Sequence, residues 1–214
     1  MSQDVAAERE AMVEHQLAGR GIGDQRVLDA FRRVPREAFV APYLAAYAYE
    51  DNPLPIGEGQ TISQPYVVAL MTEAAKVAPG ARVLDVGTGS GYAAAILAEL
   101  AGEVVCIERH TALVEHARRA LAGLGYRNVE VREGDGSEGV PERAPYDAIL
   151  VAAGAPAIPA SLKAQLAEGG RMVIPVGANF YQDLLVITRR GDSYETDNLG
   201  GVRFVPLVGQ EGWT

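Results

Sequence analysis

The sequence has little cysteine and a shortage of basic residues. Among its 214 residues there is one cysteine, Cys106, so an internal disulfide and a multi-cysteine metal site are both excluded. Cys106 lies in the apolar run VVCIE, which predicts a buried thiol. The 19 Lys and Arg residues are outnumbered by 28 Asp and Glu residues, and the net charge is −9. Because nucleic-acid binding depends mostly on a positive electrostatic field, we expect no nucleic-acid partner. We also expect no metal ion.

Long apolar runs are also missing. No stretch reaches the roughly 18 apolar residues of a membrane-spanning helix, and the polar start MSQDVAAERE does not resemble a secretion signal. We therefore expect a cytoplasmic protein that does not associate with membranes. A chain that is 48% hydrophobic and 22% charged has the composition of a globular protein with one sizeable core. This composition predicts a single domain over residues 1–214.

The first sixty residues are typical of helices and loops. EREAMVEHQL and DQRVLDAFRRV carry apolar residues at helical spacing, and Asp24 is a candidate N-cap for the second of them. Several prolines then interrupt the chain, and Pro65 suits the first turn of a helix over PYVVALMTEAAKV. We expect residues 1–64 to form a helical flank and an active-site loop, and residues 65–214 to form the core.

From residue 82 onward, short β-branched runs alternate with helical stretches. The predicted strands are RVLDV, EVVCIE, NVEVRE, YDAILVA and RMVIPV, and the helices between them are YAAAILAEL, TALVEHARRALAGL and IPASLKAQLAE. At the end of the chain, DLLVITRR, the turn RGDS and GVRFVPLVG predict antiparallel edge strands. The pattern predicts a doubly wound, Rossmann-like α/β fold with a mostly parallel central sheet, an antiparallel C-terminal edge and a helical N-terminal flank.

A glycine-rich turn follows the first predicted strand of the core. In VLDVGTGSGY, Gly87, Gly89 and Gly91 stand where the chain passes from strand to helix, and glycines there let the backbone approach a ligand closely. Glu108 ends the next strand, 21 positions after Gly87, where an acid can accept both hydroxyl hydrogens of an adenosine ribose. The order of strand, turn, helix, strand and acid predicts a nucleoside site.

The spacing of the glycines separates two classes of cofactor. A dinucleotide site has the pattern G-x-G-x-x-G, whereas this chain has G-x-G-x-G and Tyr92 at the next position, which favours S-adenosylmethionine. Asp85 could support the amino group of the methionine moiety, directly or through water, or could only cap the turn. Asp135, in the GDG beyond the third strand, could accept from the exocyclic amine of adenine or only form an Asp-Gly turn.

The stretch GEGQTISQP, residues 57–65, is rich in hydroxyl and amide side chains. Thr61 and Ser63 are two positions apart, so an extended backbone would point both side chains to one side. Two hydroxyl donors on one side can orient a carboxylate. A second interpretation is that Ser63 or Gln64 only caps the helix that begins at Pro65.

The chain resembles the protein-L-isoaspartate O-methyltransferases over nearly its whole length, in the segments RVPREAFV, YEDNPLPIGEGQTISQP, LDVGTGSGY, GDGSEGVPERAPYDAIL and VRFVPLVG. The resemblance implies a monomeric enzyme that transfers a methyl group from S-adenosyl-L-methionine to the free α-carboxylate of isoaspartyl residues in damaged proteins and peptides. The products are S-adenosyl-L-homocysteine and an ester that collapses to a succinimide. The chain departs from the family at Val140, where Trp is usual, and at Gly154, where Ala or Thr is commoner.

The resemblance also assigns roles to residues. Ser63 takes the position of the active-site serine, with Thr61 beside it, and the stretch around them needs no histidine because a carboxylate acceptor is already ionised at neutral pH. The residues expected to bind the cofactor are Asp85, Gly87, Thr88, Gly89, Gly91, Glu108, Asp135, Gly136 and Gln64. The residues expected to bind the acceptor are Ile62, Val205, Pro206 and Leu207.

Three other functions compete with this hypothesis. The first is a methyltransferase of the same fold that acts on another carboxylate, in a small molecule or a maturing peptide. The second is a nicotinamide-dependent oxidoreductase, against which the absence of glycine at position 92 counts. The third is a non-catalytic module that binds a nucleoside, and the intact Thr61 and Ser63 argue against it.

Overall fold

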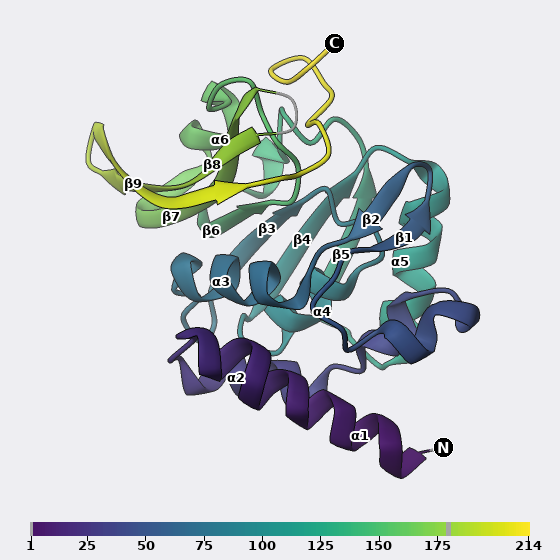
Figure 1. The fold of residues 1–214 in the computed structure, drawn as a ribbon. Coiled ribbons are helices and arrows are strands. Elements are labelled where there is room, and N and C mark those ends of the chain that lie inside the picture. Colours follow the sequence, from purple (N-terminus) through teal and green to yellow (C-terminus); the bar gives the residue numbers. More distant parts are fainter. Residues whose placement is uncertain (1, 179–180) are drawn as a thin grey trace.

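A seven-stranded sheet forms the centre of the molecule, in the order β5-β4-β3-β6-β7-β8-β9 (Figure 1). The computed structural model describes residues 2–178 and 181–214. Strands β5, β4, β3, β6 and β7 are parallel to one another, whereas β8 pairs antiparallel with β7 and β9 pairs antiparallel with β8. The strands are β3 Arg82–Val86, β4 Glu103–Glu108, β5 Val129–Glu133, β6 Tyr146–Val151, β7 Leu166–Ala178, β8 Tyr181–Arg190 and β9 Ser193–Val202. The predicted Rossmann-like fold with an antiparallel C-terminal edge is therefore confirmed.

The parallel strands are apolar because both faces of the sheet are covered. Successive residues of β3 pack into different clusters, with Val83 on the side of the N-terminal helices and Leu84 on the side of α6, Ala160–Ala164. The predicted burial of Cys106 on β4 is confirmed, and this burial raises the pKa of its thiol well above the ordinary value. The thiol is part of the packing.

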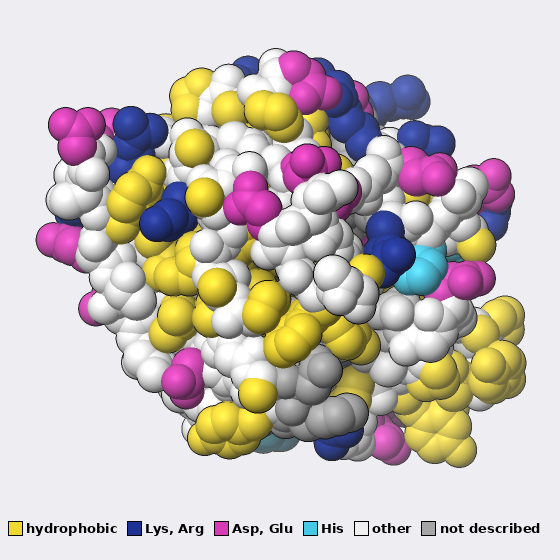
Figure 2. All heavy atoms as spheres, turned by 90° about the horizontal axis from the view of Figure 1, so that it is seen from above, with side chains coloured by type: hydrophobic (Ala, Val, Ile, Leu, Met, Phe, Trp, Pro, Cys, Tyr) yellow, Lys and Arg dark blue, Asp and Glu magenta, His cyan; other side chains and the backbone are white. Residues whose placement is uncertain are grey.

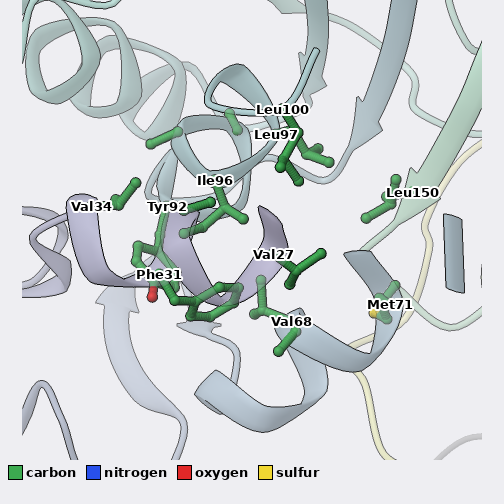
Figure 3. Packing of buried hydrophobic residues seen from close by; sticks show 14 of the residues in the cluster. Val27, Phe31, Val34, Val68, Met71, Tyr92, Ile96, Leu97, Leu100 and Leu150 are labelled. Atoms are coloured by element: carbon green, nitrogen blue, oxygen red, sulfur yellow. The ribbon is translucent and has the colours of Figure 1, made fainter. Parts of the chain in front are cut away.

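The N-terminal flank shares one core with the sheet. It comprises α1 Ser2–Ala11, the π-helical turn η1 Met12–Leu17, the short helix η2 Ala18–Arg20, α2 Gln25–Arg33, η3 Arg36–Phe39 and η4 Pro42–Tyr47. Asp24 caps α2 as predicted, because its carboxylate accepts from the amide of Arg26 at 2.8 Å. Figure 3 shows Phe31 of this flank beside Tyr92 and near Val68, which belong to the core. The flank is therefore packed into the molecule.

Helices α3 Pro65–Ala75, α4 Tyr92–Ala98 and α5 Thr111–Gly123 pack on the same side of the sheet as the flank (Figure 1). Pro65 is the first residue of α3, as its restricted φ favours. Before α3, the chain forms a two-stranded hairpin, β1 Leu54–Gly57 and β2 Gln60–Ile62. The sequence predicted a loop here, because the residues on either side of the tight turn at 58–59 do not strongly indicate strands.

Two predicted boundaries are wrong. The helix expected over residues 158–168 is limited to α6, because β7 already begins at Leu166 by pairing with Tyr146. The last strand is not GVRFVPLVG but β9, which pairs with β8 across the turn at Gly191 and Asp192. Most residues of β9 are exposed and polar, so backbone pairing specifies this edge strand and apolar alternation does not.

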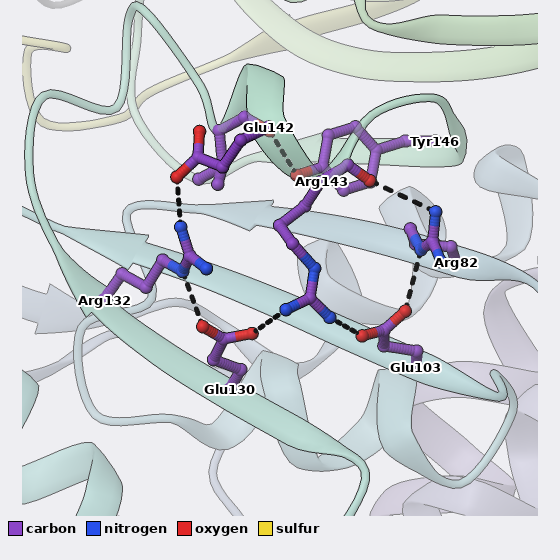
Figure 4. Close-up of polar contacts among 8 residues, drawn as sticks. Arg82, Glu103, Glu130, Arg132, Glu142, Arg143 and Tyr146 are labelled. Carbon is purple, nitrogen blue, oxygen red and sulfur yellow. Dashed lines mark hydrogen bonds and ion pairs between the residues drawn. The ribbon is translucent and has the colours of Figure 1, made fainter.

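A network of ion pairs joins the first residues of β3 and β4 to β5 and to the short helix η5, Pro141–Arg143 (Figure 4). Arg82 Nε lies 2.7 Å from Glu103 Oε2, and Arg143 Nη1 lies 2.7 Å from Glu130 Oε2, with further pairs made by Arg132 and Glu142. These side chains are partly exposed, so each pair contributes modestly to stability. Arg82, Glu103 and Glu130 stand near the amino ends of their strands, which leaves the carboxyl ends for a ligand.

None of the helices in the described ranges combines the length and the apolar character of a membrane span. Within the same ranges, no three His, Cys, Asp or Glu side chains come together as metal ligands would.

Candidate functional site

A cavity of about 300 Å³ lies at the carboxyl ends of β3, β4 and β6, where open parallel sheets commonly bind ligands. Its size is at the lower end of the range for small-molecule sites. On the face of the molecule in Figure 2, hydrophobic side chains gather near the middle, and acidic and basic side chains are interspersed. The wall is made by Gln60, Thr61, Ile62, Ser63, Val68, Gly87, Thr88, Gly89, Ser90, Tyr92, Ala93, Ile107, Glu108, Arg109, His110, Gly136, Ala152, Ala153, Val205, Pro206, Leu207 and Val208.

The glycine turn forms one side of the cavity, and its glycines differ in function. Gly89 lines the cavity at a φ of 55°, and a Cβ atom added there would lie 3.0 Å from Cδ1 of Ile56 on β1. Gly91 is the N-cap of α4 at a φ of 91° and is not part of the cavity wall. A Cβ atom on Gly91 would lie 3.2 Å from Cβ of Ala117 on α5. The third glycine therefore permits helix packing, although the sequence predicted that it would bind the cofactor.

The carboxylate of Glu108 connects the end of β4 to the glycine turn. Glu108 is buried and lines the cavity. Its Oε2 accepts from the amide of Gly89 at 3.0 Å, and its Oε1 accepts from the amide of His110 at 2.9 Å. Each carboxylate oxygen can accept a second hydrogen bond, so both can still receive a hydroxyl of a ligand. This geometry suits the predicted contact with a ribose.

Asp85 is a buried carboxylate without a partner. The residue is 1% exposed, and neither carboxylate oxygen has a hydrogen-bond partner among the described residues. Burial is the main cause that raises the pKa of Asp85 to about 7; the neighbouring Thr88 hydroxyl lowers this pKa, and the negative charge of Glu108 raises it. Asp85 lies behind the wall, with the hydroxyl of Thr88 donating to its backbone oxygen at 3.2 Å. A cationic group of a ligand would offset the cost of ionising this carboxylate.

Asp135 connects the loop after β5 to the C-terminal tail. Its Oδ1 accepts from the amide and the hydroxyl of Ser137 at 2.8 and 2.7 Å, and its Oδ2 accepts from the amide of Gln210 at 2.7 Å. Partial burial raises the pKa of Asp135, but the bonds from Gln210 and Ser137 outweigh burial and lower the pKa below its ordinary value. Gly136 lines the cavity, whereas Asp135 stands behind it. Its contact with an adenine amine stays a prediction.

The hairpin and the start of α3 bring the two predicted hydroxyls to the cavity. Thr61, Ile62 and Ser63 all line it. Gln64 is at the N-cap of α3 but makes no capping hydrogen bond with its side chain. Its Nε2 instead donates to Oδ2 of Asp51 at 2.6 Å, while Oδ1 of Asp51 accepts from the amide of Tyr66 at 3.2 Å.

Asp51 therefore caps α3 from a distant position in the sequence, and the interpretation of Gln64 as the cap is wrong. The side chain of Gln64 is bound to Asp51, and Gln64 is not part of the cavity wall. Its predicted contact with the cofactor has no support in this geometry.

Residues 205–208 form the opposite wall. Gly154 donates to the backbone oxygen of Val205 at 2.7 Å, and its own oxygen accepts from the amide of Leu207 at 2.8 Å. The predicted acceptor residues Val205, Pro206 and Leu207 all line the cavity. Gly154, one of the two departures from the family pattern, thus forms the backbone hydrogen bonds that hold this wall. The other departure, Val140, is buried in the cluster on the α6 side and is not part of the wall.

Several residues of the wall were not predicted. Most of them are next to a predicted motif in the sequence. Ser90, Tyr92 and Arg109 could have been predicted from this proximity. Tyr92 is held from behind by the flank, because its ring centroid lies 5.6 Å from that of Phe39 and 4.8 Å from the guanidinium carbon of the buried Arg36. No local signal in the sequence indicates this stacking.

Comparisons with known proteins agree on one family. The family model described as protein-L-isoaspartate(D-aspartate) O-methyltransferase (PCMT) matches residues 7–212. Among curated relatives, the protein-L-isoaspartate O-methyltransferase 2 of Marinobacter nauticus is 60% identical over 213 residues, covering 99% of this chain and 97% of the relative. The corresponding enzyme of Pelobacter propionicus is 59% identical over 207 residues, covering 96% and 92%.

Solved structures agree as well. A protein-L-isoaspartate O-methyltransferase superposes with a TM-score of 0.86 at 34% identity, covering 95% of this chain and 67% of that chain. A Plasmodium falciparum protein described as a β-aspartate methyltransferase (PCMT) in complex with S-adenosyl-L-homocysteine has a TM-score of 0.81 at 28% identity, covering 94% and 98%.

The unpartnered Asp85 predicts that ligand binding is linked to proton release. At about pH 6 the free protein should hold Asp85 mostly protonated, because its pKa is raised to about 7, and the ammonium group of S-adenosyl-L-homocysteine should favour ionisation. Calorimetry in two buffers of different ionisation enthalpy would then show a proton released on binding. Asp85→Asn should remove this release. Equal proton uptake or release in the variant and the wild type would contradict the assignment.

The same shift determines how the stability of the free protein depends on pH. Since the folded-state pKa of Asp85 lies above its ordinary value of 3.8, the folded state binds more protons between the two values. The contribution of Asp85 to the free energy of unfolding should therefore fall as the pH rises from about 4 through 7. Chemical denaturation of the wild type and of Asp85→Asn across this range measures the difference.

Proposed function

The chain belongs to the protein-L-isoaspartate O-methyltransferase family, and from this premise we propose how its residues carry out the reaction. The enzyme transfers a methyl group from S-adenosyl-L-methionine to the free α-carboxylate of L-isoaspartyl residues in damaged proteins and peptides. The ester then collapses to a succinimide, which begins repair. The observation that carries the assignment of residues is that Thr61 and Ser63 line the same cavity as Gly89 and Glu108. One cavity thus contains both a nucleoside site and a pair of hydroxyl donors.

The glycine turn and Glu108 bind the donor. When bound, S-adenosyl-L-methionine supplies a methyl group on a positively charged sulfur. Glu108 accepts hydrogen bonds from the ribose hydroxyls, while the amides of Gly89 and His110 keep its carboxylate in place. Asp85 faces the amino group, directly or through water, and this contact is supported by its lack of any other partner among the described residues. Gly87, Thr88 and Gly136 complete this half of the wall.

Ser63 and Thr61 orient the acceptor. A carboxylate with a pKa near 4 is already a nucleophile at neutral pH, so the protein has no proton to remove. In-line displacement requires the carboxylate oxygen, the methyl carbon and the sulfur to be nearly collinear, so positioning is the main task of the site. Hydrogen bonds from the two hydroxyls fix the direction of the carboxylate.

The charge of the acceptor is balanced by the donor. The charged residues of the wall are Glu108 and Arg109, which follow each other at the end of β4, where the ribose binds. The wall on the side of the hairpin consists of Gln60, Thr61, Ile62 and Ser63, which carry no charge. The negative carboxylate and the positive sulfur therefore attract each other in the cavity, and both charges are neutralised as the methyl group is transferred.

The acceptor peptide lies along residues 205–207, with Ile62 on the other side. These residues line the cavity opposite the hairpin and are tied to Gly154 through the backbone. An enzyme that repairs damage in many sequences must recognise what all peptides share, and main-chain contacts fulfil this requirement. Side-chain pockets would restrict it to particular sequences.

We also propose that residues 1–214 act as a single domain and as a monomer in the cytoplasm, without nucleic acid or membrane. The shared core of flank and sheet supports the single domain.

The acceptor is tested with two peptides that differ only in the linkage of one aspartate. Labelled methyl groups should be transferred from S-adenosyl-L-methionine to the isoaspartyl peptide and not measurably to its aspartyl isomer. Equal rates with both peptides would overturn the proposal. Transfer to neither peptide by a protein that still binds S-adenosyl-L-homocysteine would favour a methyltransferase for another carboxylate.

Ser63→Ala should lower turnover by about ten- to a hundredfold, which corresponds to the loss of one hydrogen bond to a charged group, roughly 1.5–3 kcal/mol. The wild-type rate at saturating donor should change little between about pH 6 and 8, because no base is titrated. Ser193→Ala is the matched control, since this serine is the first residue of β9, directly after the turn, and its hydroxyl donates to the backbone of Arg190. Unchanged turnover in Ser63→Ala would exclude the orienting role.

The charge balance predicts that acceptor affinity depends on the donor. Sinefungin carries an amine where the methyl donor has its sulfonium group, whereas S-adenosyl-L-homocysteine is neutral there. An isoaspartyl peptide should bind at least about fivefold more tightly to the sinefungin complex, because two opposite charges then lie close together. A peptide with an α-carboxamide in place of the carboxylate should show no such preference. If both peptides prefer sinefungin equally, the attraction does not involve the carboxylate.

A further inference from the structure

The segment of residues 203–208, which we name the acceptor strap, leaves the sheet where β9 ends at Val202. Its middle is held by the two backbone hydrogen bonds with Gly154 at 2.7 and 2.8 Å. Its far end is held by Trp213, whose amide donates to the oxygen of Leu207 at 2.7 Å and whose indole Nε1 donates to the oxygen of Gly154 at 3.0 Å. The near end of the strap is bound differently, by a side chain.

Gln182 holds this near end. It lies on β8 and pairs through its backbone with Val202. Its side-chain Oε1 accepts from the amide of Phe204 at 2.9 Å, and its Nε2 donates to the oxygen of Ala178 at 3.1 Å. Because one end of the amide faces a donor and the other an acceptor, its orientation is determined by its partners. The residue is 2% exposed, so the Gln182 end of both hydrogen bonds is buried, whereas Phe204 is only partly buried and Ala178 is exposed.

The position of Gln182 explains why a polar side chain is buried here. Backbone pairing between β8 and β9 stops at Val202, and the half-buried Phe204 amide would otherwise need another partner. The side-chain amide of Gln182 replaces the next backbone partner. It also packs against Gly154, since a Cβ atom added to Gly154 would lie 2.9 Å from Cδ of Gln182. One side chain therefore contacts the strap and the residue to which the strap is tied.

We propose that Gln182 is a positioning residue for the acceptor. It is not part of the cavity wall and touches neither ligand. By binding Phe204 it determines where the strap leaves the sheet, and hence how far a peptide along residues 205–207 lies from Ser63. This role depends on the proposed function, since it assumes that the strap binds the acceptor. Displacement of a reacting group by about 1 Å can lower a rate by about a hundredfold.

Replacing Gln182 by Met keeps a similar volume and removes both hydrogen bonds. For Gln182→Met, kcat/KM with an isoaspartyl peptide should fall at least about tenfold, through a higher KM and a lower kcat, because the contact that positions the strap is lost. The dissociation constant of S-adenosyl-L-homocysteine should stay within about twofold, since the donor residues are elsewhere.

Thr188→Val is the matched control, because Thr188 is also buried on β8 but pairs with Arg171 and Glu195, which are not part of the cavity wall. Thr188→Val should leave KM unchanged, because no contact with the strap is altered. Equal KM values for both variants, or weakened donor binding in Gln182→Met, would overturn the positioning role.

Hydrogen exchange tests the same contact without any turnover. In the wild type, the amide of Phe204 should be protected from exchange, because it donates to the buried side chain of Gln182. In Gln182→Met, exchange should accelerate at the amides of Phe204, Val205 and Leu207 but not in β8. Fast exchange at Phe204 in the wild type would overturn the proposal even if the variant does not fold. A protein that fails to methylate isoaspartyl peptides would leave these exchange results intact, so the two failures can be told apart.

Discussion

The hydrogen bonds of the Glu108 carboxylate are the constraint on which the site depends. They join the end of β4 to the amide of Gly89 in the turn after β3, so two neighbouring strands end in one rigid unit. The turn needs a glycine at this point, since the backbone has a positive φ and Ile56 of the hairpin lies against it. The same contact with Ile56 determines how closely the hairpin approaches, and the hairpin carries Thr61 and Ser63. The donor and acceptor halves of the cavity are thus fixed relative to each other through one carboxylate and one glycine.

The distribution of charge follows the chemistry of the reaction. Arginines and glutamates pair with one another around the amino ends of the strands, far from the reacting groups (Figure 4). At the carboxyl ends, the buried carboxylate of Asp85 accepts no hydrogen bond from the part of the chain that the structure describes, and its raised pKa reflects the cost of holding a charge there. The cationic donor compensates for this carboxylate only when it binds. Methyl transfer to a carboxylate that is already ionised therefore requires neither a base nor a metal ion.

Two segments outside the main sheet complete the site. The hairpin β1–β2 comes before the core in the sequence, and the acceptor strap comes after the last strand. Each is held by a polar side chain from outside the segment itself, Asp51 for the end of the hairpin and Gln182 for the strap. Each of these buried or half-buried hydrogen bonds adds little net free energy to folding. Any other position of the segment would leave a polar group without a partner inside the protein, which costs free energy, so the bonds mainly specify position.

The sequence by itself determined the parallel core and much of the donor half. Apolar runs of strand length, the turn around Gly87 and Gly89, and an acid at the end of the next strand are local patterns, and parallel pairing brings their ends together whatever the details of packing. The spacing of Thr61 and Ser63 predicted that both side chains point to one side, but the active-site role of Ser63 came from the resemblance to the family.

Only the tertiary structure decided the rest. The assignment of Gly91 to helix packing, the capping of α3 by Asp51, the tail bound by Asp135 and the strap held by Gln182 all join residues that are distant in sequence. The sequence placed the last strand at residues 201–209, although it ends at Val202, because a polar edge strand is specified by its backbone partners. A polar side chain can form hydrogen bonds in several directions, and the neighbouring sequence does not indicate which partner it has. The packing of the folded chain determines that partner.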